Sequence, residues 1–305
     1  MLWPCEKVKV TMPRIITTGT QSFEKLRQNN YFYVDKTQFI REWWLGGDPV
    51  TLITRPRRFG KTLMLDTVNT FFSPKFAGRS ELFEGLEIWN DEKFQNLQGK
   101  IPVIFLSFAD IKGESYSKIF ELIKDSLVCL YDIFKPNFDL SLFTDTEKEQ
   151  LVSVNRSMSA ATAQTSLRHL TKYLARQFDA SPIILLDEYD TPLQEAWLNG
   201  YWDKLAQFMR GFFNSTFKTN PYLERGLITG ITRVAKESIF SDLNNLEVIL
   251  RTERFRVPSV AHADIACVVR GIDRNSYPSR VYHNHKYSLY RLLWLYRAGG
   301  LLSHG

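Results

Sequence analysis

The chain has few cysteines and no long apolar run, and these two shortages limit the classes of protein to which it can belong. Its 305 residues include only three cysteines, Cys5, Cys129 and Cys267, whose spacing gives neither a disulfide framework nor a zinc site. No stretch approaches the roughly 18 apolar residues of a membrane-spanning helix, and the first residues lack the apolar centre of a secretion signal. We therefore expect a cytoplasmic protein with no membrane partner.

Acidic residues are scarce after position 249, and this makes the charge uneven. From Leu250 to Gly305, nine Lys and Arg accompany three acidic residues, an excess equal to the whole net charge of +6. Such a basic tail could contact the phosphates of a nucleic acid. Its Arg and Tyr residues follow no helical or strand period, however, so we favour an irregular, poorly folded segment over a nucleic-acid-binding one.

Apolar runs typical of strands alternate with helical patterns before this tail. The strand-like runs cover 49–54, 101–108, 182–187 and 225–231, with a shorter one at 31–34. Helical patterns cover 21–29, a stretch capped by Asp35, a stretch from Lys61, 116–134, 165–178 and 202–217. This alternation predicts an α/β fold with a parallel β-sheet flanked by helices.

The first strand-like run leads into a loop that lacks one expected glycine. Residues 54–62 read Thr-Arg-Pro-Arg-Arg-Phe-Gly-Lys-Thr and precede a helical pattern, which is the context of a phosphate-binding loop. The full pattern has a glycine where this chain has Arg55. A plain surface helix start is the alternative interpretation. If the loop binds a nucleotide, its binding residues are Arg57, Arg58, Phe59, Gly60, Lys61 and Thr62.

A second motif supports the phosphate-binding interpretation. Residues 182–188, Pro-Ile-Ile-Leu-Leu-Asp-Glu, form an apolar run that ends in two carboxylates. Such a run suits a buried parallel strand, whose carboxyl end is where ligands bind in α/β sheets. Asp187 and Thr62 are then the predicted Mg²⁺-binding residues, and Glu188 would polarise the attacking water. A solvated strand end is the alternative, and either motif alone is weak.

Two further motifs point to a known family. Residues 33–37 read Tyr-Val-Asp-Lys-Thr and residues 229–233 read Thr-Gly-Ile-Thr-Arg. With the loop and the Leu-Asp-Glu-Tyr-Asp of 186–190, they resemble the predominantly bacterial AAA-ATPase-like proteins over about residues 14–249. The loop of that family also lacks the first glycine. The resemblance implies a P-loop NTPase domain that uses ATP and Mg²⁺.

The chain departs from the family after Val248. Family members commonly continue into further helices and a nuclease-like domain of the PD-(D/E)XK type, which this chain does not resemble. We expect an irregular N-terminus at 1–13, the AAA-ATPase-like domain at 14–249 and an atypical basic tail at 250–305. A coding truncation or a reading-frame change near residue 249 would explain both the lost resemblance and the change in composition.

The expected function is ATP binding with slow, Mg²⁺-dependent hydrolysis. Fold analogy places the strand at 226–230 between the first and third strands, which would bring Thr229, Thr232 or Arg233 near the γ-phosphate. Glu188, Lys61 and Arg233 are the predicted catalytic residues, with a salt bridge as the alternative role of Arg233. A homo-oligomer or a protein partner would complete the site. The alternative is a non-hydrolysing nucleotide switch or an inactive remnant.

Overall fold

The computed structural model describes residues 15–17, 19–218, 220–231, 239–240, 243 and 245–249. Backbone contacts separate the residues up to Asp35 from a larger unit that begins at Lys36. Within these described ranges, no helix has the length and apolar character needed to cross a membrane. The predicted N-terminal segment 1–13, the basic tail 250–305 and Arg233 lie outside the described residues.

The first unit contains the short helix α1 (Phe23–Gln28), within the range predicted for it. The side chain of Ser22 caps α1 by accepting a hydrogen bond from the backbone N–H of Lys25. The strand predicted at 31–34 is wrong: these residues form no β-ladder. Among the described residues, one backbone hydrogen bond links them to an earlier segment, from the N–H of Phe32 to the carbonyl of Ile15, and a single bond is too little for a strand.

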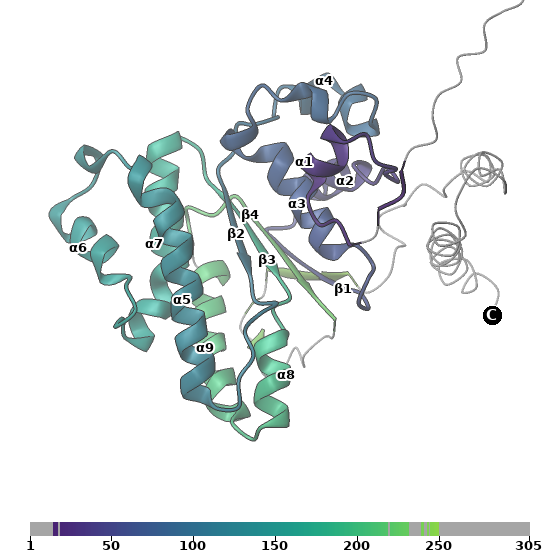
Figure 1. Cartoon of the computed structure of the whole chain (residues 1–305). Coiled ribbons are helices and arrows are strands. Elements are labelled where there is room, and N and C mark those ends of the chain that lie inside the picture. The colour runs from purple at the N-terminus through teal and green to yellow at the C-terminus, as the bar shows by residue number, and fades with distance from the viewer. Residues whose placement is uncertain are drawn as a thin grey trace, which may run out of the picture. The chain divides into compact units, whose positions relative to one another are not determined.

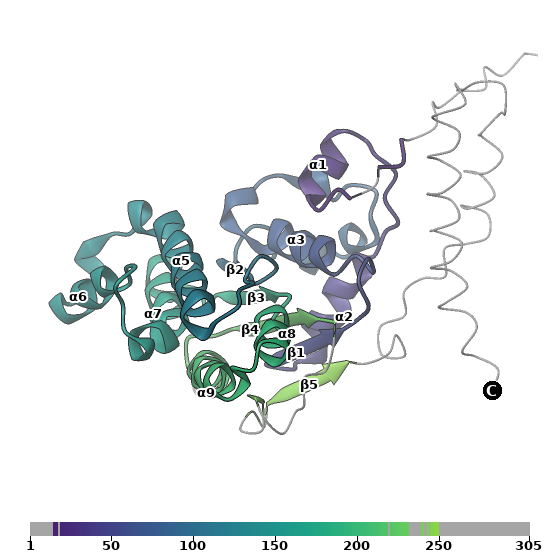
Figure 2. The ribbon, with the colours of Figure 1, turned by 60° about the horizontal axis from the view of Figure 1, so that its bottom comes forward.

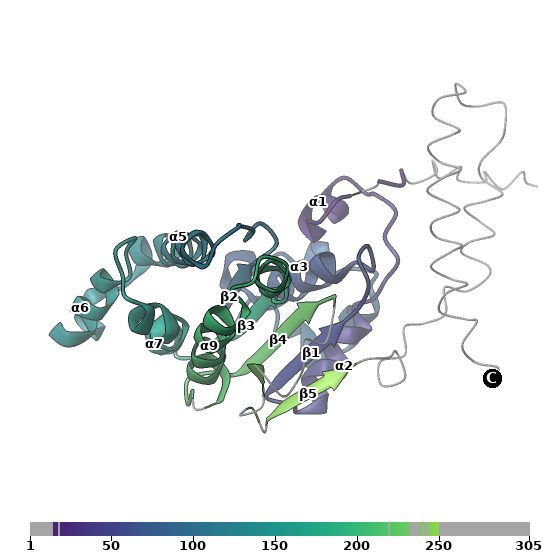
Figure 3. The ribbon, with the colours of Figure 1, turned by 90° about the horizontal axis from the view of Figure 1, so that it is seen from below.

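The larger unit is built on a sheet of five parallel strands in the order β2-β3-β4-β1-β5. The strands are β1 (Val50–Thr54), β2 (Val103–Ser107), β3 (Ile183–Asp187), β4 (Arg225–Gly230) and β5 (Leu246–Ile249). Figure 3 shows β2 and β5 at opposite edges of the sheet. Four of these strands match the predicted runs, and β4 lies between β1 and β3 as fold analogy suggested.

Parallel register brings four strand ends to one edge of the sheet. Thr54 at the end of β1 is opposite Gly230 of β4, and Ser107 of β2 is opposite Asp187 of β3. The middle strands are almost wholly buried, since β1 and β3 have no residue more than slightly exposed. Their apolar side chains therefore form the core, and the polar groups are left at the carboxyl edge.

Helices cover the sheet and fill the connections between its strands (Figure 1). They are α2 (Gln38–Gly46), α3 (Lys61–Phe72), α4 (Glu92–Gln95), α5 (Tyr116–Phe134), α6 (Asp145–Ser153), α7 (Ala160–Phe178), α8 (Thr191–Leu198) and α9 (Trp202–Phe213). Helix α3 packs across the three strands β2, β3 and β4. Figure 2 shows α5, α6 and α7 grouped beyond the β2 edge. Thr37, and not Asp35 as predicted, occupies the N-cap position of α2, and its side chain makes no capping hydrogen bond there.

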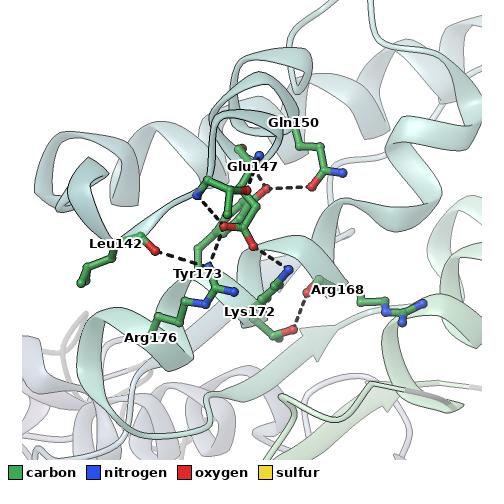
Figure 4. Close-up of polar contacts among 9 residues, drawn as sticks. Leu142, Glu147, Gln150, Arg168, Lys172, Tyr173 and Arg176 are labelled. Atoms are coloured by element: carbon green, nitrogen blue, oxygen red, sulfur yellow. Dashed lines mark hydrogen bonds and ion pairs between the residues drawn. The ribbon is translucent and has the colours of Figure 1, made fainter.

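Helix α6 is absent from the sequence-based expectations, although its start carries a recognisable signal. The hydroxyl of Thr144 accepts from the backbone N–H of Glu147, and the Glu147 carboxylate accepts from the N–H of Thr144, which is a capping box. The same carboxylate receives Lys172 Nζ at 2.5 Å and an Arg176 guanidinium nitrogen at 2.6 Å (Figure 4). Glu147 thus joins α6 to α7.

Candidate nucleotide-binding site

The loop between β1 and α3 closes without the glycine that the full pattern has at position 55. Two residues with positive φ supply the turn, Arg58 at 70° and Gly60 at 75°. Gly60 is the N-cap of α3, and its carbonyl accepts the first helical hydrogen bond, from Met64. At the other end, the N–H of Arg55 donates to the carbonyl of Gly230 at 3.1 Å. The loop is therefore anchored to both β4 and α3.

Lys61 holds this loop together from inside. Its side chain is 7% exposed, and Nζ donates to the carbonyl of Arg55 at 3.0 Å and to that of Pro56 at 3.2 Å. Burial lowers the pKa of the Lys61 ammonium, and the nearby carboxylates of Glu188 and Asp187 oppose that shift. The residue thus places a cation at the N-terminus of α3, where backbone N–H groups already favour an anion.

The carboxylate of Asp187 receives a donor on each oxygen. Oδ2 accepts the hydroxyl of Thr62 at 2.7 Å, although the two residues are 125 positions apart. Oδ1 accepts the hydroxyl of Thr229 and, at 3.1 Å, the backbone N–H of Glu188. Asp187 and Thr229 are both buried. Thr229, which the sequence analysis named as a candidate residue near the γ-phosphate, thus contacts the acidic strand end.

Glu188 follows immediately and has an unusual backbone. Its φ of 50° lies in the left-handed region that residues other than glycine rarely adopt. Its Oε2 accepts the hydroxyl of Thr191 at 3.1 Å, and its carbonyl accepts the N–H of the same residue, also at 3.1 Å. The side chain is half-buried. The first residue of α8 thus holds the Glu188 carboxylate near the predicted phosphate-binding loop.

These contacts bring the predicted phosphate-binding loop together with the acidic strand end. Residues 17–240 match the family described as Predicted AAA-ATPase. The chain belongs to this family. It is also similar to the "Uncharacterized protein in vnfD 5'region" of Azotobacter chroococcum mcd 1, with 28% identity over 244 residues. That match covers 78% of this chain but 41% of the relative, so the chain spans less than half of that protein's length. No solved structure matches the chain.

The structure brings together four of the nine predicted site residues of this AAA-ATPase-like chain. Lys61, Thr62, Asp187 and Glu188 lie at the carboxyl edge of the sheet, joined by the contacts above. From the loop, Arg57, Arg58 and Gly60 are exposed and Phe59 is half-buried, so these remain predicted phosphate contacts.

Asp190, the last residue of the Leu-Asp-Glu-Tyr-Asp motif, is buried close to the site residues. It occupies the N-cap position of α8 but makes no capping bond there with its side chain. Its Oδ2 instead accepts the N–H of Ile231 at 3.0 Å and the side-chain amide of Gln194 at 2.9 Å. Gly230 permits this contact, because an added Cβ would lie 2.8 Å from Asp190 Oδ1. Asp190 thus ties the end of β4 to α8.

Proposed function

We propose that this chain binds ATP together with Mg²⁺ and hydrolyses the nucleotide slowly. The observation that supports this most is the hydrogen bond between Thr62 and Asp187, because it joins the end of the loop to the end of the acidic strand. A phosphate-type loop next to an acidic strand end is the arrangement that P-loop NTPases use for phosphoryl transfer. The family membership supports the same assignment.

The donors in the loop suit a polyphosphate. Backbone N–H groups from Arg58 to Thr62 surround the start of α3, which carries the positive end of the helix dipole. Lys61 adds a full charge, and it would exchange its two backbone carbonyl partners for phosphate oxygens. The exposed guanidinium groups of Arg57 and Arg58 would add further contacts to the same anion.

The polar groups around Asp187 fit a hydrated magnesium ion. Thr62 donates its hydroxyl proton to Asp187, so the oxygen of Thr62 keeps its lone pairs for a cation. Both oxygens of Asp187 already accept hydrogen bonds, so this carboxylate would act on metal-bound water. A bound Mg²⁺ would neutralise charge on the β- and γ-phosphates. We thus propose that Thr62 would bind the ion directly and that Asp187 would bind it through water.

Glu188 is the proposed general base. Within the part of the chain that the structure describes, only Oε2 of this carboxylate has a hydrogen-bond partner, Thr191. Oε1 is therefore available to take a proton from water as the water oxygen attacks the γ-phosphorus. The bond from the γ-phosphorus to the β-γ bridging oxygen breaks in this step, and ADP leaves. We further propose that Arg233 contacts the transferred phosphoryl group.

Turnover by the isolated chain should be slow. The charge that builds on the transferred phosphoryl group is commonly stabilised by an additional arginine, worth about 10³–10⁵ in rate where it is present. We propose that another copy of the chain or a protein partner supplies such a charge. The isolated protein would then bind ATP well but hydrolyse it at a low basal rate.

The test compares phosphate release by the wild-type chain and by Glu188→Gln, with Mg²⁺ and saturating ATP. We expect Glu188→Gln to bind ATP as tightly as the wild type while releasing phosphate at least about 100-fold more slowly, the usual range for loss of a general base. Equal rates in the two proteins would remove Glu188 as the base. Tight binding with no hydrolysis in either protein would support the non-hydrolysing nucleotide switch.

A further inference from the structure

We propose that Thr191 is a positioning residue for hydrolysis: its hydroxyl holds the carboxylate of Glu188 in place. This inference rests on the proposed function and adds a residue that neither motif contains. Thr191 donates to Glu188 twice, through its backbone N–H to the carbonyl and through its hydroxyl to Oε2, both at 3.1 Å. An ionised carboxylate only accepts hydrogen bonds, so the hydroxyl proton must point to Oε2.

Thr191 can position another side chain because it is itself fixed. It is the first residue of α8 and is 5% exposed. The residues that follow on the inner side of the helix, Pro192, Leu193 and Ala196, are buried as well. Pro192 lies in the first turn of α8, where its ring suits the helical φ and no hydrogen bond is lost. The hydroxyl therefore lies on a rigid element, as a positioning group requires.

The backbone of Glu188 fixes the other end of its side chain. A residue other than glycine at φ 50° is strained and persists only where neighbours impose that conformation. Three backbone N–H donors impose it here: those of Glu188 to Asp187, Tyr189 to Thr229, and Thr191 to Glu188. Strain of this kind collects at functional sites. The backbone thus fixes the direction in which the Glu188 side chain leaves the chain, and the Thr191 hydroxyl fixes the position of its carboxylate.

This arrangement gives the two carboxylate oxygens of Glu188 different roles. Oε2 is engaged by Thr191, which leaves Oε1 as the proton acceptor. Without the hydroxyl, the three side-chain torsions of Glu188 regain freedom, and the base spends less time in the reactive geometry. We expect the loss to appear in the rate of hydrolysis and not in the affinity for ATP, because the hydroxyl of Thr191 bonds to Glu188 and not to a residue of the loop.

The experiment compares Thr191→Val, Thr191→Ala and Thr191→Ser in the full chain, measuring ATP affinity and the single-turnover rate for each. Val and Ala remove the hydroxyl, whereas Ser retains it. Thr70→Val is the matched control, because Thr70 is also buried and its hydroxyl donates at 2.7 Å to the carbonyl of Asp66 and not to Glu188. We expect a five- to tenfold slower rate for Val and Ala, affinities within twofold of wild type, and near-wild-type rates for Ser and for the control.

A second background separates positioning from a general loss of structure. In Glu188→Gln, adding Thr191→Val should slow the residual reaction no further, because the side chain that it orients can no longer act as a base. An equal loss in both backgrounds would overturn the proposal, as would wild-type rates for both Val and Ala. If Glu188→Gln is slow while Thr191→Val is not, this inference fails and the proposed function stands. If Glu188→Gln is itself as fast as wild type, the proposed base fails first.

Discussion

Glu147 offers the sharpest quantitative prediction, because its contacts define both the size and the pH dependence of the effect. Burial opposes the ionisation of its carboxylate, but the hydrogen bonds from Lys172, Thr144 and Arg176 outweigh burial and lower its pKa from 4.5 to about 2 (Figure 4). The change to test is Glu147→Gln, which keeps the shape of the side chain and removes its charge. The variant should weaken the joint between α6 and α7.

The pKa shift sets an upper limit to the effect on stability. Each pKa unit corresponds to about 1.4 kcal/mol, so the shift allows about 3 kcal/mol. The Glu147 side chain is 5% exposed, but those of Lys172 and Arg176 are 28% and 37% exposed. Water therefore screens part of the attraction and rehydrates the two cations once their partner is lost. We expect a loss of about 2 kcal/mol, or roughly 4–8 °C in Tm.

Thermal unfolding of both proteins at pH 7 and at lower pH is the assay. Because the folded-state pKa is depressed, the stabilisation is complete above about pH 4.5 and is lost as the pH falls through 2. The difference between wild type and Glu147→Gln should therefore halve near pH 3. Asp145→Asn is the control on the same helix, since the 96% exposed Asp145 pairs with Lys148 at the surface and should contribute little. Equal effects of the two substitutions, or a difference independent of pH, would refute the reasoning.

Two further substitutions test the carboxyl edge of the sheet. Thr229→Val removes a buried donor to Asp187, so we expect a stability loss of about 1.5–3 kcal/mol by urea unfolding and a several-fold higher Mg²⁺ requirement for ATP binding; Thr229→Ser should preserve both. Gly230→Ala would place a Cβ 2.5 Å from the ring of Tyr189, and we expect this overpacking to lower stability by about 1–3 kcal/mol. An unchanged Tm for Gly230→Ala would contradict the close packing at this strand end.

Local patterns were sufficient for most strands and helices that frame the site, although α8, whose first residue contacts Glu188, was not predicted. The strand runs that contain β1 and β3 were predicted from short apolar segments, and α5 was predicted with the bounds that it has, 116–134. The loop before α3 was predicted from Gly60, Lys61 and Thr62, because phosphate and Mg²⁺ binding require these residue types. These features depend on residues close together in sequence, which a pattern can contain.

Features that escaped prediction depend on tertiary contacts or on a local backbone conformation that the residue types do not indicate. Strand β5 has only four residues and pairs with β1, which lies nearly 200 positions earlier in the chain. The contact of Thr191 with Glu188 is local but follows from the left-handed backbone at Glu188, which no residue pattern indicates for a glutamate. The strand predicted at 31–34 had the right composition but no partner strand, and composition alone does not make a ladder. The predicted domain limits and the role of Arg233 remain predictions.

The central claim is that the loop around Lys61 binds ATP, and one titration tests it most directly. Fluorescent ATP would be titrated in the presence of Mg²⁺ into the wild-type chain and into Lys61→Ala, with Lys112→Ala, an exposed lysine beyond β2, as the control. We predict saturable binding to the wild type and to the control, and a loss of at least about 100-fold in affinity for Lys61→Ala, since a charge-assisted contact to phosphate is removed. Equal affinity in all three proteins, or no binding by the folded wild type, would contradict the assignment of this loop.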